Sequence, residues 1–232
     1  MTMDRTIVVG DVHGCLDELQ ALLELCGWRP GGGDRLVLAG DLVAKGPDSQ
    51  GVVQLAREAG ASAAAVLGNH DAHVLRIRDA ARGAAPPPAK VRPHHERVAA
   101  ELGPADWRYL ESLPLFVRLG PEREGDGDTV VLHGGAVPGV AIEKQSRENL
   151  INMRSITSSG EPSKKIEGKP WAAVWPGPER IVFGHDAVRG LQEHRFALGL
   201  DTGCVYGGRL TAVLLPERAL VSVRARRAYA EP

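Results

Sequence analysis

Cysteines are scarce in this sequence of 232 residues. There are only three, Cys15, Cys26 and Cys204, which are widely spaced and form no C-x-x-C pair. An odd number of separated cysteines argues against a disulfide framework and against a zinc site made of thiolates. We interpret Cys15, which follows a promising polar motif, as a small buried thiol.

Long apolar runs and a strong net charge are also missing. No apolar run approaches the roughly 18 residues of a membrane-spanning helix, and the first predicted strand begins too early to leave room for a signal peptide. We therefore expect a cytoplasmic protein without a membrane partner. The 28 basic and 29 acidic residues give a net charge of -1, so no overall field attracts nucleic acid. Any anion must be bound by local groups, and we expect no stable nucleic-acid partner.

Apolar residues, 43% of the chain, are sufficient for one full core, so we predict a single domain over residues 1–232. Its first part alternates between strands and helices, which predicts a parallel sheet in an α/β fold. The predicted strands cover residues 7–9, 36–39 and 63–67, and the predicted helices cover 16–26, 50–59 and 71–82.

The pattern changes between residues 83 and 113, where G-A-A-P-P-P ends a helix and two short helices follow. We interpret this segment as a small helical cap insert over the site. His94 and His95 could touch substrate there, but an exposed polar helix face is the favoured interpretation. Beyond residue 115 most segments alternate as strands, and the polar residues 158–169 are typical of a mobile loop. The later strands are predicted at 115–119, 129–133, 180–183, 197–200, 210–214 and 220–223.

Five apolar strands are each followed by glycine or histidine and by side chains that bind metals. The clearest example is Leu36–Ala39, a strand buried on both faces, followed by Gly40 and Asp41. Because open α/β sheets carry their chemistry at the carboxyl ends of strands, we expect these side chains to meet at one edge. They are Asp11, His13, Asp41, Asn69, His70, His133 and His185.

This set contains oxygen and imidazole donors and no thiolate, which suits Mn²⁺, Fe or Zn²⁺ and favours Mn²⁺. Seven residues exceed what one ion needs. Two ions about 3.5–4 Å apart and bridged by a carboxylate would use six of them and leave one imidazole free. Such a pair turns a bridging water into hydroxide and neutralises phosphoryl oxygens, so the pattern predicts a two-metal phosphohydrolase. Asp11 and Asn69 could each be a simple helix cap, but independent caps would not be paired with histidines at every strand end.

Five ordered motifs together resemble those of the calcineurin-like metallophosphoesterases, in the phosphoprotein-phosphatase branch. They are G-D-V-H-G (10–14), G-D-L-V-A-K-G (40–46), G-N-H-D (68–71), H-G-G (133–135) and G-H (184–185). The resemblance spans nearly the whole chain and implies a β-sandwich flanked by helices. It also implies roles for the seven residues: Asp11, His13 and Asp41 hold one metal, Asp41, Asn69, His133 and His185 hold the other, and His70 is the general acid.

Within that branch, residues 41–49, 67–73 and 200–211 are similar to the bacterial symmetrical diadenosine tetraphosphatases. The segment 152–154 is similar to an arginine motif of that family. The resemblance implies attack of a metal-bridging hydroxide at the centre of a dinucleoside tetraphosphate, with two ADP as products. It places Lys45 and Arg154 beside the reacting phosphoryl group.

Two positions depart from the related patterns. Ala44 stands where protein phosphatases have an aspartate that orients the catalytic histidine, so another acid is needed, and Asp201 is our candidate. Lys45 stands where an arginine is usual, which replaces a bidentate fork with a point charge.

Other functions share these motifs. A Ser/Thr phosphoprotein phosphatase has the same ligands, and so does a nucleotide or RNA-end phosphatase. A non-catalytic interaction protein with this fold would have lost ligands, whereas none is missing here. We therefore expect an enzyme whose partner is a small phosphate-containing substrate, with a phosphoprotein as the alternative.

Overall fold

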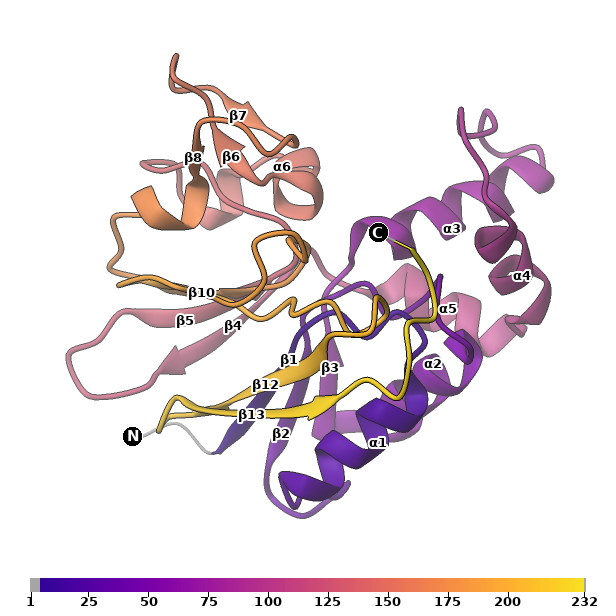
Figure 1. The fold of residues 1–232 in the computed structure, drawn as a ribbon, viewed down its shortest axis with the longest axis horizontal. Helices are drawn as coiled ribbons and strands as arrows, with labels where there is room; N and C mark the ends of the chain where they lie inside the picture. The colour runs from indigo at the N-terminus through magenta and orange to yellow at the C-terminus, as the bar shows by residue number, and fades with distance from the viewer. Residues whose placement is uncertain (1–4, 232) are drawn as a thin grey trace.

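Two five-stranded β-sheets stack against each other at the centre of the protein, in a computed structural model that describes residues 5–231 (Figure 1). The first sheet has the order β13-β12-β1-β2-β3. Its strands β1, β2 and β3 are parallel, as predicted, and β12 pairs with β1 in the antiparallel sense. The bounds are β1 Thr6–Val9, β2 Arg35–Leu38, β3 Ala63–Ala65, β12 Arg209–Leu215 and β13 Ala219–Arg224.

The second sheet has the order β10-β11-β9-β5-β4 and comes from the second half of the chain. Strands β5, β9 and β11 are parallel, while β4 and β10 form antiparallel edges. The five strands that carry candidate ligands are therefore divided between two sheets, three in the first and two in the second. The bounds are β4 Phe116–Pro121, β5 Asp128–Leu132, β9 Arg180–Phe183, β10 Gln192–Glu193 and β11 Ala197–Gly199.

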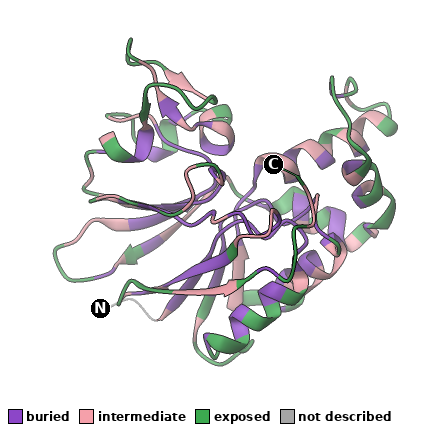
Figure 2. Cartoon of the chain, in the orientation of Figure 1, coloured by how far each residue is buried: buried purple, intermediate pink, exposed green. Residues whose placement is uncertain are grey.

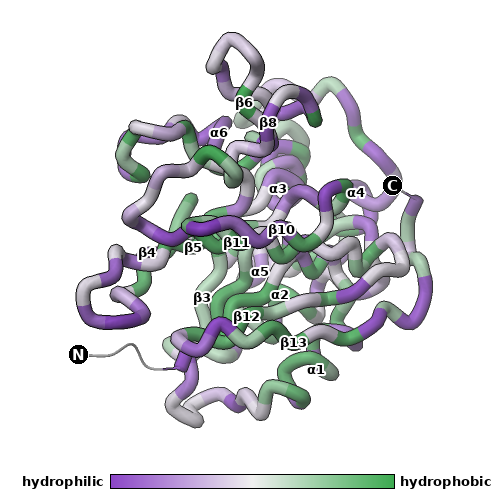
Figure 3. The backbone as a smooth tube through the Cα atoms, turned by 60° about the vertical axis from the view of Figure 1, so that its left-hand side comes forward, coloured by the Kyte–Doolittle hydropathy of each residue, from purple (hydrophilic) through white to green (hydrophobic). Residues whose placement is uncertain are grey.

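Apolar side chains alternate between the two faces of each sheet. In β1, Val8 points into the layer between the sheets, while Ile7 and Val9 face helices α1 (Leu16–Leu25) and α2 (Ser49–Glu58). Because both faces are covered, the strands are continuous apolar runs, as in Figures 2 and 3, where the central strands are buried and hydrophobic. The outer face of the second sheet packs against Trp171 and helix α6 (Arg147–Asn152). The predicted α/β fold, a β-sandwich flanked by helices, is confirmed.

The helical insert lies beside the first sheet. Helices α4 (Pro93–Glu101) and α5 (Pro104–Ser112) contact α3 (Asn69–Ala81) and α2, and their apolar residues Val98 and Leu110 join the core of that sheet. The start of α4 reaches the end of the molecule where the candidate ligands lie. This arrangement brings a segment far along the chain next to the first turn of α3.

A small sheet escaped the sequence analysis. Strands β6 (Ser155–Ile156), β7 (Pro162–Ser163) and β8 (Lys169–Pro170) pair in the order β7-β6-β8. The segment interpreted as a mobile loop is therefore paired to β6 in its interior, through β7, and at its end, through β8. Strands of two residues carry no periodic signal. Three short 3₁₀ turns, Gly60–Ser62, Ile142–Lys144 and Trp171–Val174, complete the fold. In the part of the chain that is described, no helix is both long and apolar enough to cross a membrane.

Candidate metal centre

Sharp turns follow the strands that carry the candidate ligands. Five residues there have a positive φ although they are not glycine: His13 (49°), Asp41 (49°), Ala44 (75°), Lys45 (68°) and His185 (71°). Only one other non-glycine residue within 5–231 adopts such a conformation. Non-glycine residues enter this region rarely and at a cost, and they gather where the surrounding structure holds a functional geometry.

Glycines at these turns let ligands approach the backbone closely. A Cβ atom on Gly184 would overlap the Asp11 Oδ1 atom, and one on Gly68 would overlap the backbone nitrogen and Oδ1 of Asp41. The recurrence of glycine in the motifs therefore has a local steric reason.

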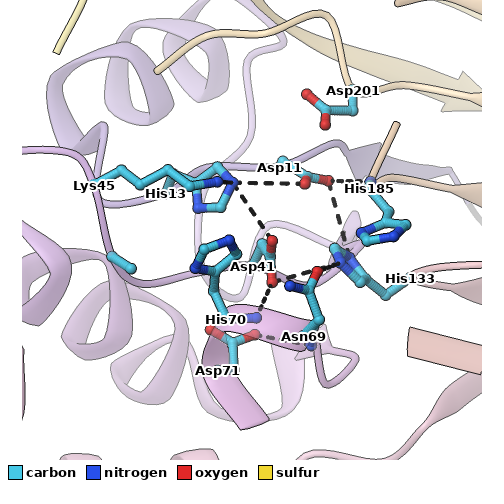
Figure 4. A network of polar contacts seen from close by, with 12 residues as sticks. Asp11, His13, Asp41, Lys45, Asn69, His70, Asp71, His133, His185 and Asp201 are labelled. Atoms are coloured by element: carbon cyan, nitrogen blue, oxygen red, sulfur yellow. Dashed lines mark hydrogen bonds and ion pairs between the residues drawn. The ribbon is translucent and has the colours of Figure 1, made fainter. Parts of the chain in front are cut away.

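The six predicted metal ligands converge on one region at the edge of the sandwich (Figure 4). Asp41 Oδ2 lies 3.4 Å from His13 Nε2, and its other oxygen, Oδ1, lies 3.5 Å from His133 Nε2. Asp11 Oδ2 is 3.8 Å from His13 Nε2, and Asp11 Oδ1 accepts a hydrogen bond from the His185 backbone at 2.9 Å. Asp41 is thus the carboxylate that lies between the two groups of ligands.

The three imidazoles of this centre each donate one ring N–H to a backbone carbonyl. A carbonyl only accepts, so the other ring nitrogen must be an unprotonated acceptor in the neutral ring. The pairs are His13 Nδ1 with Val43 O (3.2 Å), His133 Nδ1 with Ala39 O (2.9 Å) and His185 Nε2 with Asn152 O (2.9 Å). In metal sites, a hydrogen bond from the other ring nitrogen to a carbonyl fixes the orientation of a histidine ligand.

The remaining acceptors face one another. His133 Nε2 lies 3.0 Å from Asn69 Oδ1, two atoms with lone pairs, and this contact favours a cation between or beside them. Lys45 Nζ lies 2.9 Å from His13 Nε2, so this ring nitrogen faces a positively charged group. The donor set therefore fits divalent metal ions with oxygen and imidazole ligands.

Burial determines the electrostatics of the metal-free centre. It raises the pKa of Asp11 well above its usual range, helped by the nearby Asp201 and Asp41 carboxylates, and raises the pKa of Asp41 to about 6. Burial also lowers the pKa of His13 well below the usual value and that of His133 to about 4. The imidazoles are therefore neutral, which is the form that binds metals, and positive ions would stabilise the buried carboxylates.

His70 lies beside this centre in the first turn of α3 but differs from the other histidines. Its backbone N–H donates to Asp41 Oδ1 at 2.8 Å, and its ring lies edge-on to that of His13, with centroids 5.0 Å apart. Within residues 5–231 its Nδ1 has no carbonyl partner and instead lies 3.1 Å from Nε2 of His95. The ring is therefore held by a side chain of α4.

The expectation that Asp201 orients His70 is wrong. Figure 4 places Asp201 on the far side of Asp11 and His13 from His70, and its carboxylate accepts from the Gly203 backbone at 3.1 Å. The interpretation of His95 as an exposed residue is also wrong, because it is 5% exposed and fills the place beside His70. Ala44, which leaves His70 without an acidic partner, was the signal that another residue was needed.

Asp71 was not singled out from the sequence, although it follows His70 directly. It is fully buried and accepts three backbone hydrogen bonds, from Leu42 (3.0 Å), Val43 (3.2 Å) and Gly68 (2.9 Å). Burial raises its pKa to about 7. Asp71 therefore ties the turn after β2 to the start of α3, which keeps Asp41 and His70 in register.

Lys45 and Arg154 both line a cavity of about 470 Å³ that opens onto the predicted ligands. Arg154 donates to the backbone oxygens of His185 at 2.9 Å and Lys164 at 3.2 Å, which positions its guanidinium beside the centre. Lys45 Nζ also lies 5.2 Å from the centre of the Tyr206 ring.

A second cavity, of about 660 Å³, lies on the other side of Asn69 and His70, which line both. Its wall carries three cationic side chains, those of Arg76, Arg147 and Lys164, and one carboxylate, that of Glu148. The metal centre is therefore flanked by two hollows, each with positive charge.

Comparison with known proteins defines the class of protein. Residues 4–215 match the calcineurin-like phosphoesterases, and the chain belongs to this family of hydrolases that use divalent metals. It is 34% identical to the asymmetrical bis(5'-nucleosyl)-tetraphosphatase PrpE of Bacillus velezensis, over 96% of this chain and 93% of the relative. It is 30% identical to the symmetrical bis(5'-nucleosyl)-tetraphosphatase of Dechloromonas aromatica, over 94% and 95% of the two chains.

A solved structure is similar across nearly its whole length. A crystal structure of a protein provisionally described as a diadenosine tetraphosphatase has a TM-score of 0.83 and 38% identity, covering 96% of this chain and 94% of the other. The resemblance drawn from the five motifs is thereby confirmed.

Proposed function

We propose that this protein is a two-metal phosphohydrolase that cleaves dinucleoside polyphosphates. The observation that carries the proposal is the convergence of oxygen and imidazole acceptors whose second nitrogens are held by backbone carbonyls. Such a set is built to hold cations, and Lys45 Nζ, 2.9 Å from His13 Nε2, is a positive group that already contacts it.

We assign Asp11, His13 and Asp41 to one metal and Asn69, His133 and His185 to the other, with Asp41 shared because each of its oxygens faces a different imidazole. The mixture of carboxylate, amide and imidazole favours Mn²⁺ over softer ions. When bound, two such ions supply a water acidified for attack and neutralise charge on the phosphoryl oxygens.

The protein's own residues bind and orient the substrate. Lys45 and Arg154 offer positive charge to the phosphoryl group in the cavity of about 470 Å³. His70 adjoins the same cavity and protonates the leaving oxygen, while its other nitrogen is held by His95. His95 is thus a positioning residue, because it acts on the substrate only through His70.

The two cavities support a substrate that extends on both sides of the cleaved bond. One contains apolar surface from Tyr206 and Val188, and Val188 is 75% exposed, which suits a nucleoside base. The other is cationic and suits phosphates with the second nucleoside. Division of a long anion between the two hollows places the cut near its middle, so we expect two ADP from diadenosine tetraphosphate.

A turnover panel tests this function. Diadenosine tetraphosphate, ATP, a phosphoserine peptide and an aryl phosphate are compared with added Mn²⁺, and the nucleotide products are separated by chromatography. We expect the dinucleotide to have the highest kcat/KM and to yield ADP alone. ATP plus AMP would place the reaction with the asymmetrical relatives, and preference for the peptide would favour a protein phosphatase.

Removal of metal tests the chemistry independently of the substrate. Protein freed of metal by chelation should be inactive, and Mn²⁺ should restore turnover. Full activity at a verified metal content of zero would exclude the two-metal reading. Absence of turnover on every substrate, with two metals bound, would support a non-catalytic interaction protein.

Lys164 and Lys165 allow a matched test of whether the substrate extends into the second cavity. Lys164 lines the second cavity and Lys165 does not. Lys164→Gln should therefore raise KM for diadenosine tetraphosphate several-fold and leave the aryl phosphate nearly unchanged. Lys165→Gln is the control, and an equal effect of both substitutions would indicate general charge attraction instead of a subsite.

The location is a separate prediction. All three cysteines are free thiols, which agrees with a reducing compartment. We accordingly propose that the enzyme acts in the cytoplasm, on a small phosphate-containing partner.

A further inference from the structure

Three histidine side chains meet at the start of α4, outside the binuclear centre. We call His70, His94 and His95 the histidine cluster. His95 Nε2 lies 3.1 Å from His70 Nδ1 and 3.2 Å from His94 Nε2, so one nitrogen is approached by two others. Each of the three offers a ligand atom within 4.8 Å of the other two.

These separations correspond to a metal site. Imidazole nitrogens bound tetrahedrally at about 2.0–2.1 Å from Zn²⁺ lie about 3.3–3.4 Å apart. A single proton on His95 Nε2 can be donated well along only one of its two contacts, whereas a cation satisfies all three nitrogens. We propose that the histidine cluster is a third metal-binding site, selective for Zn²⁺ and similar borderline ions, which inhibits the enzyme by binding the outer nitrogen of His70.

The site is open to ions. His70 and His94 are partly exposed, and His70 and His95 line the cavity of about 660 Å³, which supplies water for a fourth ligand. The ring of His73 is a fourth imidazole nearby, and its centroid lies 4.4 Å from the centroid of the His95 ring. The Nε2 atom of His73 is buried without a hydrogen-bond partner in the described structure. The cluster is therefore rich in neutral imidazole and contains no carboxylate.

Charge around the cluster selects the kind of ion. Burial first, and then Lys45, Arg92 and Arg97, lower the pKa of His94 to about 4, so its ring is neutral and ready to ligate. The same cations repel a metal ion. Only ions that form strong bonds to imidazole overcome this repulsion, which excludes Mg²⁺ and Ca²⁺ and disfavours Mn²⁺.

Binding requires one proton to move. The Arg92 backbone N–H points at His95 Nδ1 at 3.4 Å, so in the metal-free cluster the His95 proton is on Nε2. On metal binding this proton moves to Nδ1, and the weak 3.4 Å contact is lost. No proton leaves the protein, and Nε2 becomes a ligand.

Occupation would change the chemistry of His70. A metal bound to Nδ1 takes the place of the His95 contact that holds this ring, so it changes the position from which the other ring nitrogen donates to the leaving oxygen. This consequence rests on the role of His70 in the proposed function, whereas the binding of the ion does not.

The experiment uses the Mn²⁺-loaded enzyme and adds Zn²⁺ while free Mn²⁺ is kept in excess. We expect inhibition of the wild type and a loss of Zn²⁺ affinity of about 10-fold or more in His94→Ala, with unchanged activity before Zn²⁺ is added. His194→Ala, which removes a histidine distant in sequence from the cluster, is the matched control and should behave as the wild type. Equal inhibition of His94→Ala would mean that Zn²⁺ acts at the binuclear centre, and it would overturn the proposal.

A binding measurement separates this proposal from the proposed function. Elemental analysis of the Mn²⁺-loaded protein after exposure to Zn²⁺ should find three metals in the wild type and two in His94→Ala. Two metals in both proteins would refute the third site even if the enzyme were fully active. Three metals in the wild type without turnover on any substrate would instead refute the proposed function and leave the site standing.

Discussion

The candidate metal centre and the histidine cluster use the same side chain in two different ways. In the centre, His13, His133 and His185 each bond a backbone carbonyl and are almost completely buried. In the cluster, the rings of His70 and His95 contact each other through side-chain nitrogens alone. Backbone carbonyls fix the proton of each ligand on one nitrogen and so prepare a rigid ligand, whereas His70 Nδ1 has a ring nitrogen as its hydrogen-bond partner in the described structure, which suits an acid.

The substitution Asp41→Asn is the sharpest test of the candidate metal centre. A neutral amide bridges two cations poorly, so we expect Mn²⁺ affinity to fall about 100-fold or more and activity to fall with it. Elemental analysis and kcat are measured on the same preparation. The exposed Asp17→Asn is the control, and normal metal content with a normal rate would remove Asp41 from its bridging position.

The substitution His70→Asn tests the histidine cluster. It should lower kcat by about 10²- to 10⁴-fold with both metals still bound, because a proton donor is lost while the ligands stay. The loss should be smaller for diadenosine tetraphosphate than for a phosphoserine peptide, since a phosphate leaving group has a second pKa of about 6 and needs less protonation. Loss of metal equal to that of Asp41→Asn would contradict the division between the two regions.

His95 tests whether the contact within the cluster matters for the reaction. We expect His95→Leu to lower kcat about 10-fold with KM and metal content unchanged, because His70 Nδ1 loses its hydrogen-bond partner in the described structure. His95→Gln, whose amide can donate or accept at the same place, should recover much of this loss. Equal effects of both variants, with equal melting temperatures, would mean that His95 serves packing alone.

The smallest expected effect concerns pH and the rigid centre. In the metal-free protein the pKa of Asp41 is raised to about 6, mainly by burial, and metal binding needs the ionised carboxylate. The part of the Mn²⁺ affinity that depends on Asp41 should therefore be full above pH 6 and fall by up to about tenfold for each pH unit below it. Calorimetry in buffers of different ionisation enthalpy counts the released protons, and an affinity independent of pH would contradict the raised pKa.

Much of the rigid centre follows from local sequence. Buried strands such as β2 end in a glycine and then a ligand, and the glycine is needed because the ligand of a neighbouring turn approaches its backbone, as Asp11 approaches Gly184. The family resemblance and the α/β sandwich were predictable for this reason. The seven candidate side chains could be chosen because their spacing from the strand ends repeats, and the structure brings them together.

The sequence by itself thus determined the longer strands, the turns after them and the set of candidate ligands, because these depend on neighbours a few residues apart. Only the tertiary structure decided that the strands divide between two sheets, that Asp201 lies away from His70 and that His95 contacts it. The direction of the His95 side chain depends on how α4 is rotated about its own axis. This rotation is set by Val98 on the same helix, which packs into the core of the first sheet. Contacts of this kind arise from the packing of segments that no spacing rule connects, so they leave no pattern in the sequence.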